Sequence, residues 1–208
     1  MSFFPSHPYD NIQAYVEDYA EQIRRAFSAL NLENLRSAAA ILEGAMDRRS
    51  NIFVCGNGGS AAIANHFVCD HSKGIRSDTD VLPRVTSLSS NVEILTAIAN
   101  DFSYERIFEF QLSSLAAEGD VLVAVSSSGN SPNIIEVLKW ARQNHVTSVA
   151  LTGFEGGEAR KVADVTLHVQ AANYGVIEDV HQSLMHILAQ YIRQKRLHKR
   201  EQLGLLKF

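Results

Sequence analysis

The sequence has little cysteine, no long apolar run and no excess of basic charge. Only two cysteines, Cys55 and Cys69, occur among its 208 residues, which is too few for a disulfide framework and is typical of a reduced, cytoplasmic protein. No apolar stretch approaches the roughly 18 residues that a membrane-spanning helix requires, so we expect no membrane partner. The formal net charge of −4 leaves no basic footprint, so we expect no nucleic-acid partner.

Two common nucleotide-binding motifs are also missing. The sequence contains no Gly-x-x-x-x-Gly-Lys-Ser/Thr, which argues against a nucleotide hydrolase with that phosphate loop. Its one dense glycine run, at residues 56–60, lacks the third glycine of the dinucleotide-binding fingerprint. A phosphate group, if the protein binds one, must therefore be held in another way.

Short apolar runs alternate with helical patterns through most of the chain. Strands buried on both faces and separated by helices are typical of a parallel sheet. The sequence therefore predicts an α/β fold, a three-layer sandwich with a five-stranded parallel sheet and an N-terminal helical hairpin. The expected strands are at about 51–55, 84–88, 121–125, 147–152 and 165–169, and the expected helices at about 9–31, 33–48, 60–72, 91–99, 103–117, 132–144 and 175–196.

We expect a single domain over residues 1–208, because this length and 46 % apolar residues suffice for one sizeable core. Its parts are N-terminal helices at about 1–48, an α/β core at about 49–197 and a C-terminal tail at 198–208. The basic run 193–200 is interpreted as the solvated end of the last helix, where cations complement the helix dipole.

Two strands are each followed by a loop of small, hydroxyl-rich residues. The first is Gly56-Asn-Gly-Gly-Ser60, which opens a helix and places Ser60 at the expected N-cap. The second is Ser126-Ser-Ser-Gly-Asn-Ser131, followed by a proline suited to a first helical position. Each loop alone is also compatible with an ordinary strand-to-helix turn. Together, their backbone amides, helix N-termini and hydroxyls indicate a site for a phosphorylated molecule.

Ionisable residues recur at helical spacing in two distant segments. His66 and Asp70 lie four residues apart, and Glu178, Gln182 and His186 form a stripe with His181 beside it. Either group is compatible with a solvated helix surface. If the two segments meet, two imidazoles and two carboxylates form a plausible zinc set of His66, Asp70, Glu178 and His186. His71 is a weak candidate, and the remaining histidines, His7, His145, His168 and His198, are interpreted as incidental.

Several motifs, in order along nearly the whole chain, resemble the sugar isomerase (SIS) domain family, and within it the phosphoheptose isomerases. They are Gly56-Asn-Gly-Gly-Ser60, His66-Phe67, Ala99-Asn-Asp-Phe102, Gly119-Asp-Val-Leu122, Ser126-Ser-Ser-Gly-Asn-Ser131 and Ala150-Leu-Thr-Gly153, with Gly156-Gly157 close behind. Phosphoheptose isomerases convert sedoheptulose 7-phosphate to D-glycero-D-manno-heptose 7-phosphate.

The resemblance implies a flavodoxin-like sheet in a homotetramer whose active sites are shared between subunits. It implies isomerisation through an enediol, with Asp70 and His186 as the catalytic acid–base pair. One zinc ion per subunit is implied at His66, Asp70, Glu178 and His186. The expected substrate-binding residues are Asn57, Gly58, Gly59, Ser60, Ser90, Asn91, Ser126, Ser127, Ser128, Ser131 and Glu178.

Three positions depart from the family pattern. Asp70 replaces a glutamate and is one methylene shorter, which retracts the carboxylate by roughly 1.5 Å. Glu178 replaces a glutamine, and Asn91 replaces the aspartate that usually follows the serine at position 90. The family's basic residue after the first core helix aligns poorly, and Lys73 or Arg76 stands nearest to it.

These departures leave three functions open. The first is a sugar-phosphate isomerase, for a seven-carbon or another sugar. The second is a non-catalytic interaction protein resembling the factor that associates with the bacterial replication initiator DnaA. The third is a regulatory module that binds a sugar phosphate. Retention of His66, Asp70, Glu178 and His186 favours the enzyme over the non-catalytic protein.

Overall fold

The computed structural model describes residues 3–208, except for the side chain of Gln202. The first two residues of the expected N-terminal segment, about 1–48, lie outside the described part. Across residues 3–208, no helix is both long enough and apolar enough to cross a membrane.

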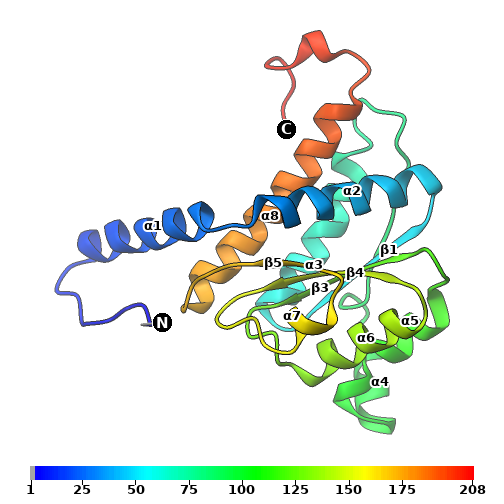
Figure 1. The fold of residues 1–208 in the computed structure, drawn as a ribbon, viewed down its shortest axis with the longest axis horizontal. Coiled ribbons are helices and arrows are strands. Elements are labelled where there is room, and N and C mark those ends of the chain that lie inside the picture. Colours follow the sequence, from blue (N-terminus) through cyan, green and yellow to red (C-terminus); the bar gives the residue numbers. More distant parts are fainter. Residues whose placement is uncertain (1–2) are drawn as a thin grey trace.

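Five parallel strands form one sheet in the order β2-β1-β3-β4-β5, which confirms the flavodoxin-like sheet (Figure 1). Successive side chains point to opposite faces of a strand. In β1, Ile52 and Val54 therefore join one apolar core, whereas Phe53 and Cys55 join the other. The strands are β1 Asn51–Gly56, β2 Arg84–Ser87, β3 Val121–Ser126, β4 Thr147–Thr152 and β5 Val165–His168.

Helices cover both faces of the sheet and complete the three layers. The α-helices are α1 Ile12–Ser28, α2 Leu32–Arg48, α3 Gly59–Cys69, α4 Val92–Asp101, α5 Glu109–Leu115, α6 Pro132–Gln143, α7 Ala159–Val162 and α8 Tyr174–Arg196. Buried residues of α2, α3 and α8 pack in the core on one face, and those of α4, α5 and α6 pack in the core on the other. Because α3 follows β1 and α6 follows β3, the two central strands lead to opposite faces. Their carboxyl ends form the switch point at which such sheets bind ligands.

The two N-terminal helices are present, but their arrangement differs from the expected hairpin. Figure 1 shows α1 and α2 following one another in a row, with α1 leading away from the sheet instead of folding back along α2. α2 packs beside the sheet through Ala38, Leu42 and Ala45. Tyr19 on α1 donates a hydrogen bond of 2.7 Å to Asp179 on α8.

Two expected helices are interrupted. The helix expected at 60–72 loses its α-helical pitch after Cys69 and continues as a π-helix, Asp70–Gly74, where the Ile75 amide bonds the Asp70 carbonyl at 3.0 Å. The helix expected at 103–117 divides into a 3₁₀ turn, η2 Tyr104–Arg106, and α5. A π-helical turn inside a helix often lies at a functional site.

The C-terminal tail is folded back onto α8, and a second 3₁₀ turn, Arg200–Gln202, lies within it. Arg193, expected to be solvated, is buried instead. Its guanidinium donates to Asp78, to the Ser77 carbonyl and to the Lys207 carbonyl, and it lies 4.5 Å from the centroid of the Phe208 ring. Those partners satisfy the buried charge, so this part of the basic run anchors the tail.

Candidate active site

Ser89, which follows β2, fixes the start of the loop after β1. The Ser89 hydroxyl accepts a hydrogen bond from the Gly56 amide at 3.0 Å and donates one to the Gly56 carbonyl at 2.8 Å. The N-cap of α3 is Gly58, at φ +54°, and not Ser60 as expected. Ser60 lies one residue inside the helix because Gly59 already adopts helical geometry. No side chain caps α3, so its first amides face the loop without a side-chain acceptor.

The serine loop after β3 uses two of its hydroxyls for its own turn. The Ser126 and Ser128 side chains each accept a backbone amide hydrogen bond at 3.2 Å, from Gly129 and Asn130. The Ser127 hydroxyl is buried and has no hydrogen-bond partner among the described residues. Ser131 is the N-cap of α6, yet its side chain makes no capping hydrogen bond. Because buried polar groups are normally paired, the unpaired Ser127 hydroxyl is an exception within this loop.

The two loops enclose a cavity of about 170 Å³, which we call the serine pocket. It is lined by Asn57, Ser60, Val125, Ser126, Ser127, Ser128, Ser131, Tyr174 and Glu178. Gly59 lies against Glu178 so closely that an added Cβ would collide with the carboxylate. Partial burial, and to a lesser extent the neighbouring Asp179, raises the pKa of Glu178 above its usual range.

Ser90 and Asn91, expected at the substrate, are occupied by local hydrogen bonds and do not line the serine pocket. The Ser90 hydroxyl donates to the Ser87 carbonyl at 3.0 Å. The Asn91 side chain caps α4 by accepting the Ile94 amide at 3.0 Å. In the described chain both residues therefore have a structural role.

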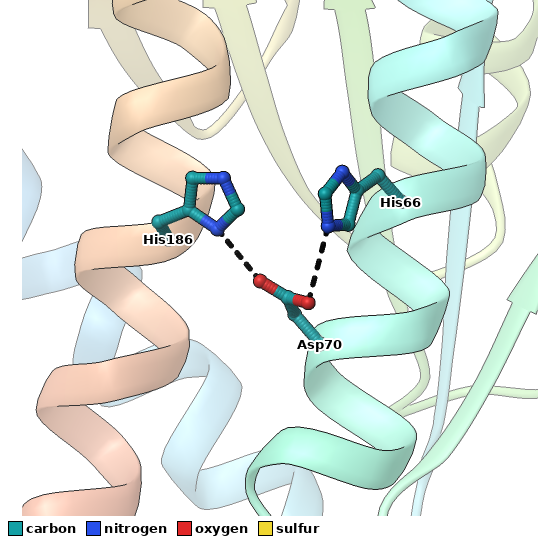
Figure 2. A group of neighbouring side chains, drawn as sticks. All are labelled: His66, Asp70 and His186. Carbon is teal, nitrogen blue, oxygen red and sulfur yellow. Dashed lines mark hydrogen bonds and ion pairs between the residues drawn. The ribbon is translucent and has the colours of Figure 1, made fainter. Parts of the chain in front are cut away.

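Three of the four predicted zinc ligands come together between α3 and α8 (Figure 2). One Asp70 carboxylate oxygen lies 2.7 Å from His186 Nδ1, and the other lies 3.3 Å from His66 Nε2. The two imidazole rings are 5.0 Å apart between centroids and nearly perpendicular. Asp70 thus bridges two imidazoles from helices that are over 100 residues apart in the sequence. The carboxylate reaches both although it is one methylene shorter than the family's glutamate.

Glu178 is the predicted ligand that the structure does not bring to this group. It lies two helical turns before His186, or about 12 Å along α8, whereas His66 and Asp70 are only one turn apart. Gln182 occupies the intermediate turn instead. Its amide nitrogen lies 3.1 Å from His66 Nδ1 and 3.0 Å from His186 Nε2. Glu178 faces the serine pocket.

The chemistry of these donors fits a zinc ion. Two imidazole nitrogens and a carboxylate oxygen lie within 4.8 Å of one another, and three such ligands with an open position are the usual set of a catalytic zinc site. His71, the weak candidate, is not part of the group, because it is buried and stacked on Phe67. Burial lowers the pKa of His71 to about 4.

Asp70 and His186 line a second cavity, of about 410 Å³, which shares no residue with the serine pocket. The tail residues Lys207 and Phe208 form part of its wall, together with Lys73 and Arg193. Within one chain, the hydroxyl-rich loops and the Asp70–His186 pair therefore face different cavities.

The model of the SIS domain family matches residues 14–153, which is more than half of the chain. This chain belongs to the SIS domain family. It is 37 % identical over 177 residues to a probable phosphoheptose isomerase of Thermoplasma acidophilum, an alignment that covers 85 % of this chain and 97 % of that protein. It is 34 % identical to the phosphoheptose isomerase of Nitratidesulfovibrio vulgaris, over 87 % of this chain and 88 % of the relative.

Solved structures agree with the SIS domain assignment. The phosphoheptose isomerase GmhA of Neisseria gonorrhoeae superposes with a TM-score of 0.79 at 31 % identity, covering 87 % of this chain and 96 % of that chain. A phosphoheptose isomerase of Francisella tularensis gives a TM-score of 0.82 at 28 % identity, covering 89 % and 97 %.

Four polar residues at the site of this SIS domain were not among the predicted site residues. Gln182 had a sequence signal, since it lies four residues before His186 in the same polar stripe. Ser89, Tyr104 and Asn133 had none, because each reaches the site from a segment far along the chain. Tyr104 and Asn133 both hydrogen-bond the Asn57 side chain.

Proposed function

We propose that this protein is an intramolecular oxidoreductase, a sugar-phosphate isomerase that converts sedoheptulose 7-phosphate to D-glycero-D-manno-heptose 7-phosphate through an enediol. The observation that carries the proposal is the Asp70 carboxylate held between His66 and His186. It occurs in a chain whose relatives over most of its length are named phosphoheptose isomerases. The proposal assigns the same chemistry to this chain.

The reaction requires one carbon-bound proton and one oxygen-bound proton to move. In our proposal Asp70 removes the proton from C1 of the ketose and returns it to C2 of the enediol. His186, hydrogen-bonded to the same carboxylate, carries the proton exchange between the two oxygens and assists ring opening. The 2.7 Å contact between Asp70 and His186 supports their joint action, because it holds the carboxylate and the imidazole in one geometry.

The phosphate end of the substrate is assigned to the serine pocket. The unpartnered Ser127 hydroxyl, the Ser131 hydroxyl, which makes no capping hydrogen bond, and the first amides of α3 supply donors without a basic side chain. Glu178 in the same pocket accepts hydrogen bonds from sugar hydroxyls, because a carboxylate would repel the phosphate itself. Ser60, Ser126 and Ser128 complete the polar lining, with Asn57, Gly58 and Gly59 at its rim.

Zinc is the proposed cofactor, one ion per subunit, with His66, Asp70 and His186 as the ligands. When bound there, a zinc ion supplies a Lewis acid that polarises the substrate carbonyl and stabilises negative charge on the enediolate. Glu178, the fourth residue of the predicted set, stays with the serine pocket in this proposal.

We further propose that the chain is a single SIS domain over residues 1–208 and acts in the cytoplasm as a homotetramer with shared active sites. The serine pocket and the cavity that contains Asp70 and His186 are separate within one chain, which supports shared sites. In a shared site, the loops of one subunit and the acid–base pair of another would contact the same substrate. Two free cysteines, one buried and one exposed, agree with a reducing compartment.

The test combines metal analysis of the purified protein with isomerisation assays on five-, six- and seven-carbon ketose phosphates. We expect about one zinc per chain and conversion of sedoheptulose 7-phosphate in preference to the shorter sugars. Absence of turnover with every ketose phosphate, in a folded and zinc-loaded protein, would refute the proposed reaction. Selective turnover of a shorter sugar would retain the reaction but overturn the substrate.

A further inference from the structure

Asn57, at the rim of the serine pocket, is held by two side chains from other segments. Its amide forms a reciprocal pair with Asn133: Asn57 Nδ2 donates to Asn133 Oδ1 at 2.9 Å, and Asn133 Nδ2 donates to Asn57 Oδ1 at 2.9 Å. The Tyr104 hydroxyl donates a further hydrogen bond of 3.0 Å to the same Asn57 oxygen. Asn57 therefore has its oxygen and one of its two amide hydrogens already committed.

The two supporting residues lie in very different surroundings. Asn133 is in the first turn of α6, directly after the serine loop, and is only 1 % exposed. A buried amide without partners is costly, so the reciprocal pair is a strong constraint on the Asn57 side chain. Tyr104 lies on η2 and is 58 % exposed, so its ring contributes little to the core and its hydroxyl is the group that matters at Asn57.

We propose that Asn133 and Tyr104 are positioning residues that fix the Asn57 amide so that its second N–H is presented to the ligand in the serine pocket. The donor is thus set before the ligand arrives, which lowers the cost of ordering it on binding. Neither residue lines the pocket itself. The ligand class, a sugar phosphate, rests on the proposed function.

The test uses Tyr104→Phe and the nearly isosteric Asn133→Asp, which replaces the donating Nδ2 by an oxygen that opposes the Asn57 oxygen. Tyr191→Phe, also exposed and not a lining residue of either cavity, is the matched control. The Kd for sedoheptulose 7-phosphate is measured by calorimetry, KM and kcat by the isomerisation assay, and folding by thermal denaturation.

We expect Asn133→Asp to raise Kd and KM by about tenfold or more and Tyr104→Phe by about three- to fivefold, the range expected for lost hydrogen bonds. In both variants kcat should stay within about threefold, because the lost hydrogen bond stabilises the bound substrate and the transition state equally. Tyr191→Phe should leave all three constants unchanged. A merely structural role would lower the melting temperature and leave Kd and KM as they are.

Unchanged Kd in both folded variants would overturn the proposal. If Asn133→Asp does not fold, Tyr104→Phe decides alone, since its exposed ring can be altered without loss of the core. Wild-type protein that binds sedoheptulose 7-phosphate but does not isomerise it would refute the proposed reaction, while weaker binding by the variants would still support the positioning role. Wild-type protein that binds no sugar phosphate would overturn both.

Discussion

Replacement of Asp70 by asparagine tests the proposed proton transfer most directly. The Asp70→Asn variant would keep the shape of the side chain and one acceptor oxygen. It would lose the charge and one of the two carboxylate oxygens, which now lie 3.3 Å from His66 and 2.7 Å from His186. A positioned general base contributes about 10²- to 10⁴-fold to a rate, which corresponds to about 3 to 5 kcal/mol of activation free energy. We therefore expect kcat of Asp70→Asn to fall at least about a hundredfold.

The fold should tolerate this change. The Asp70 side chain is 25 % exposed, and its partners His66 and His186 are 48 % and 37 % exposed, so water screens both contacts and each contributes up to about 1 kcal/mol. KM should change little, because Asp70 does not line the serine pocket. Asp47→Asn, which breaks an exposed ion pair with Arg196, is the matched control and should leave kcat and KM unchanged.

The assay follows both turnover and deuterium incorporation at C1 and C2 of the sugar in D₂O, because exchange reports the proton-transfer step itself. Zinc content must be measured in parallel, since Asp70 is also a proposed ligand. His66→Asn provides the comparison: it removes a ligand and keeps the base. If Asp70→Asn and His66→Asn lose zinc and activity to the same extent, Asp70 acts only through the metal site and the base assignment is wrong. Full exchange in folded Asp70→Asn would also refute it.

Three further predictions concern the loops and the core. Gly129 has φ +65° and a Cβ there would overlap a backbone carbonyl, so Gly129→Ala should lower the free energy of unfolding by about 2 to 4 kcal/mol. Gly119 also has a positive φ, of +87°, but a Cβ there would lie in open space, so Gly119→Ala should lower the free energy of unfolding by only about 1 kcal/mol. If urea denaturation gives the same loss of stability for Gly129→Ala and Gly119→Ala, this reasoning is wrong. In Gly59→Ala the added Cβ meets the flexible carboxylate end of Glu178, so the melting temperature should stay nearly unchanged. Sugar-phosphate binding, measured by calorimetry, should weaken at least about fivefold because Glu178 is displaced. Unchanged affinity would count against Glu178 as a pocket residue. Burial lowers the pKa of His181 from 6.5 to about 4, so the stability that it contributes as a neutral group is complete above pH 6.5 and is lost as the pH falls toward 4. Urea denaturation of His181→Gln should therefore show a shallower loss of stability across this range than the wild type, and identical slopes would show that another group titrates.

The parallel sheet and its order of layers could be predicted because its strands are buried on both faces. Runs such as Val121–Ser126, fully buried throughout, cannot be amphipathic surface elements. β2 has a less apolar sequence than the other strands for a physical reason: it is an edge strand, and Arg84 and Thr86 are exposed. The change to a π-helix at Asp70 had no local signal, since it depends on packing around the residues that follow α3.

The meeting of His66 and Asp70 with His186 was expected from the resemblance to the SIS domain family, and only the shared faces within each helix could be predicted from helical spacing. The choice between Glu178 and Gln182 could not, because it depends on how far α8 is shifted along α3. A shift of one turn, about 5.4 Å, exchanges one residue for the other, and no pattern within either helix fixes it. The pairing of Asn57 with Asn133 was equally out of reach, since 76 residues separate them and both are common in turns and caps.

The anchoring of the tail by Arg193 has a practical consequence for work with this protein. Phe208, which packs against the Arg193 guanidinium, forms part of the wall of the cavity that contains Asp70 and His186. An affinity handle fused behind it would start at the mouth of that cavity, and a polyhistidine handle would bring competing metal ligands to it. Recombinant protein intended for zinc analysis or kinetics should therefore carry a removable handle that is cleaved off before measurement.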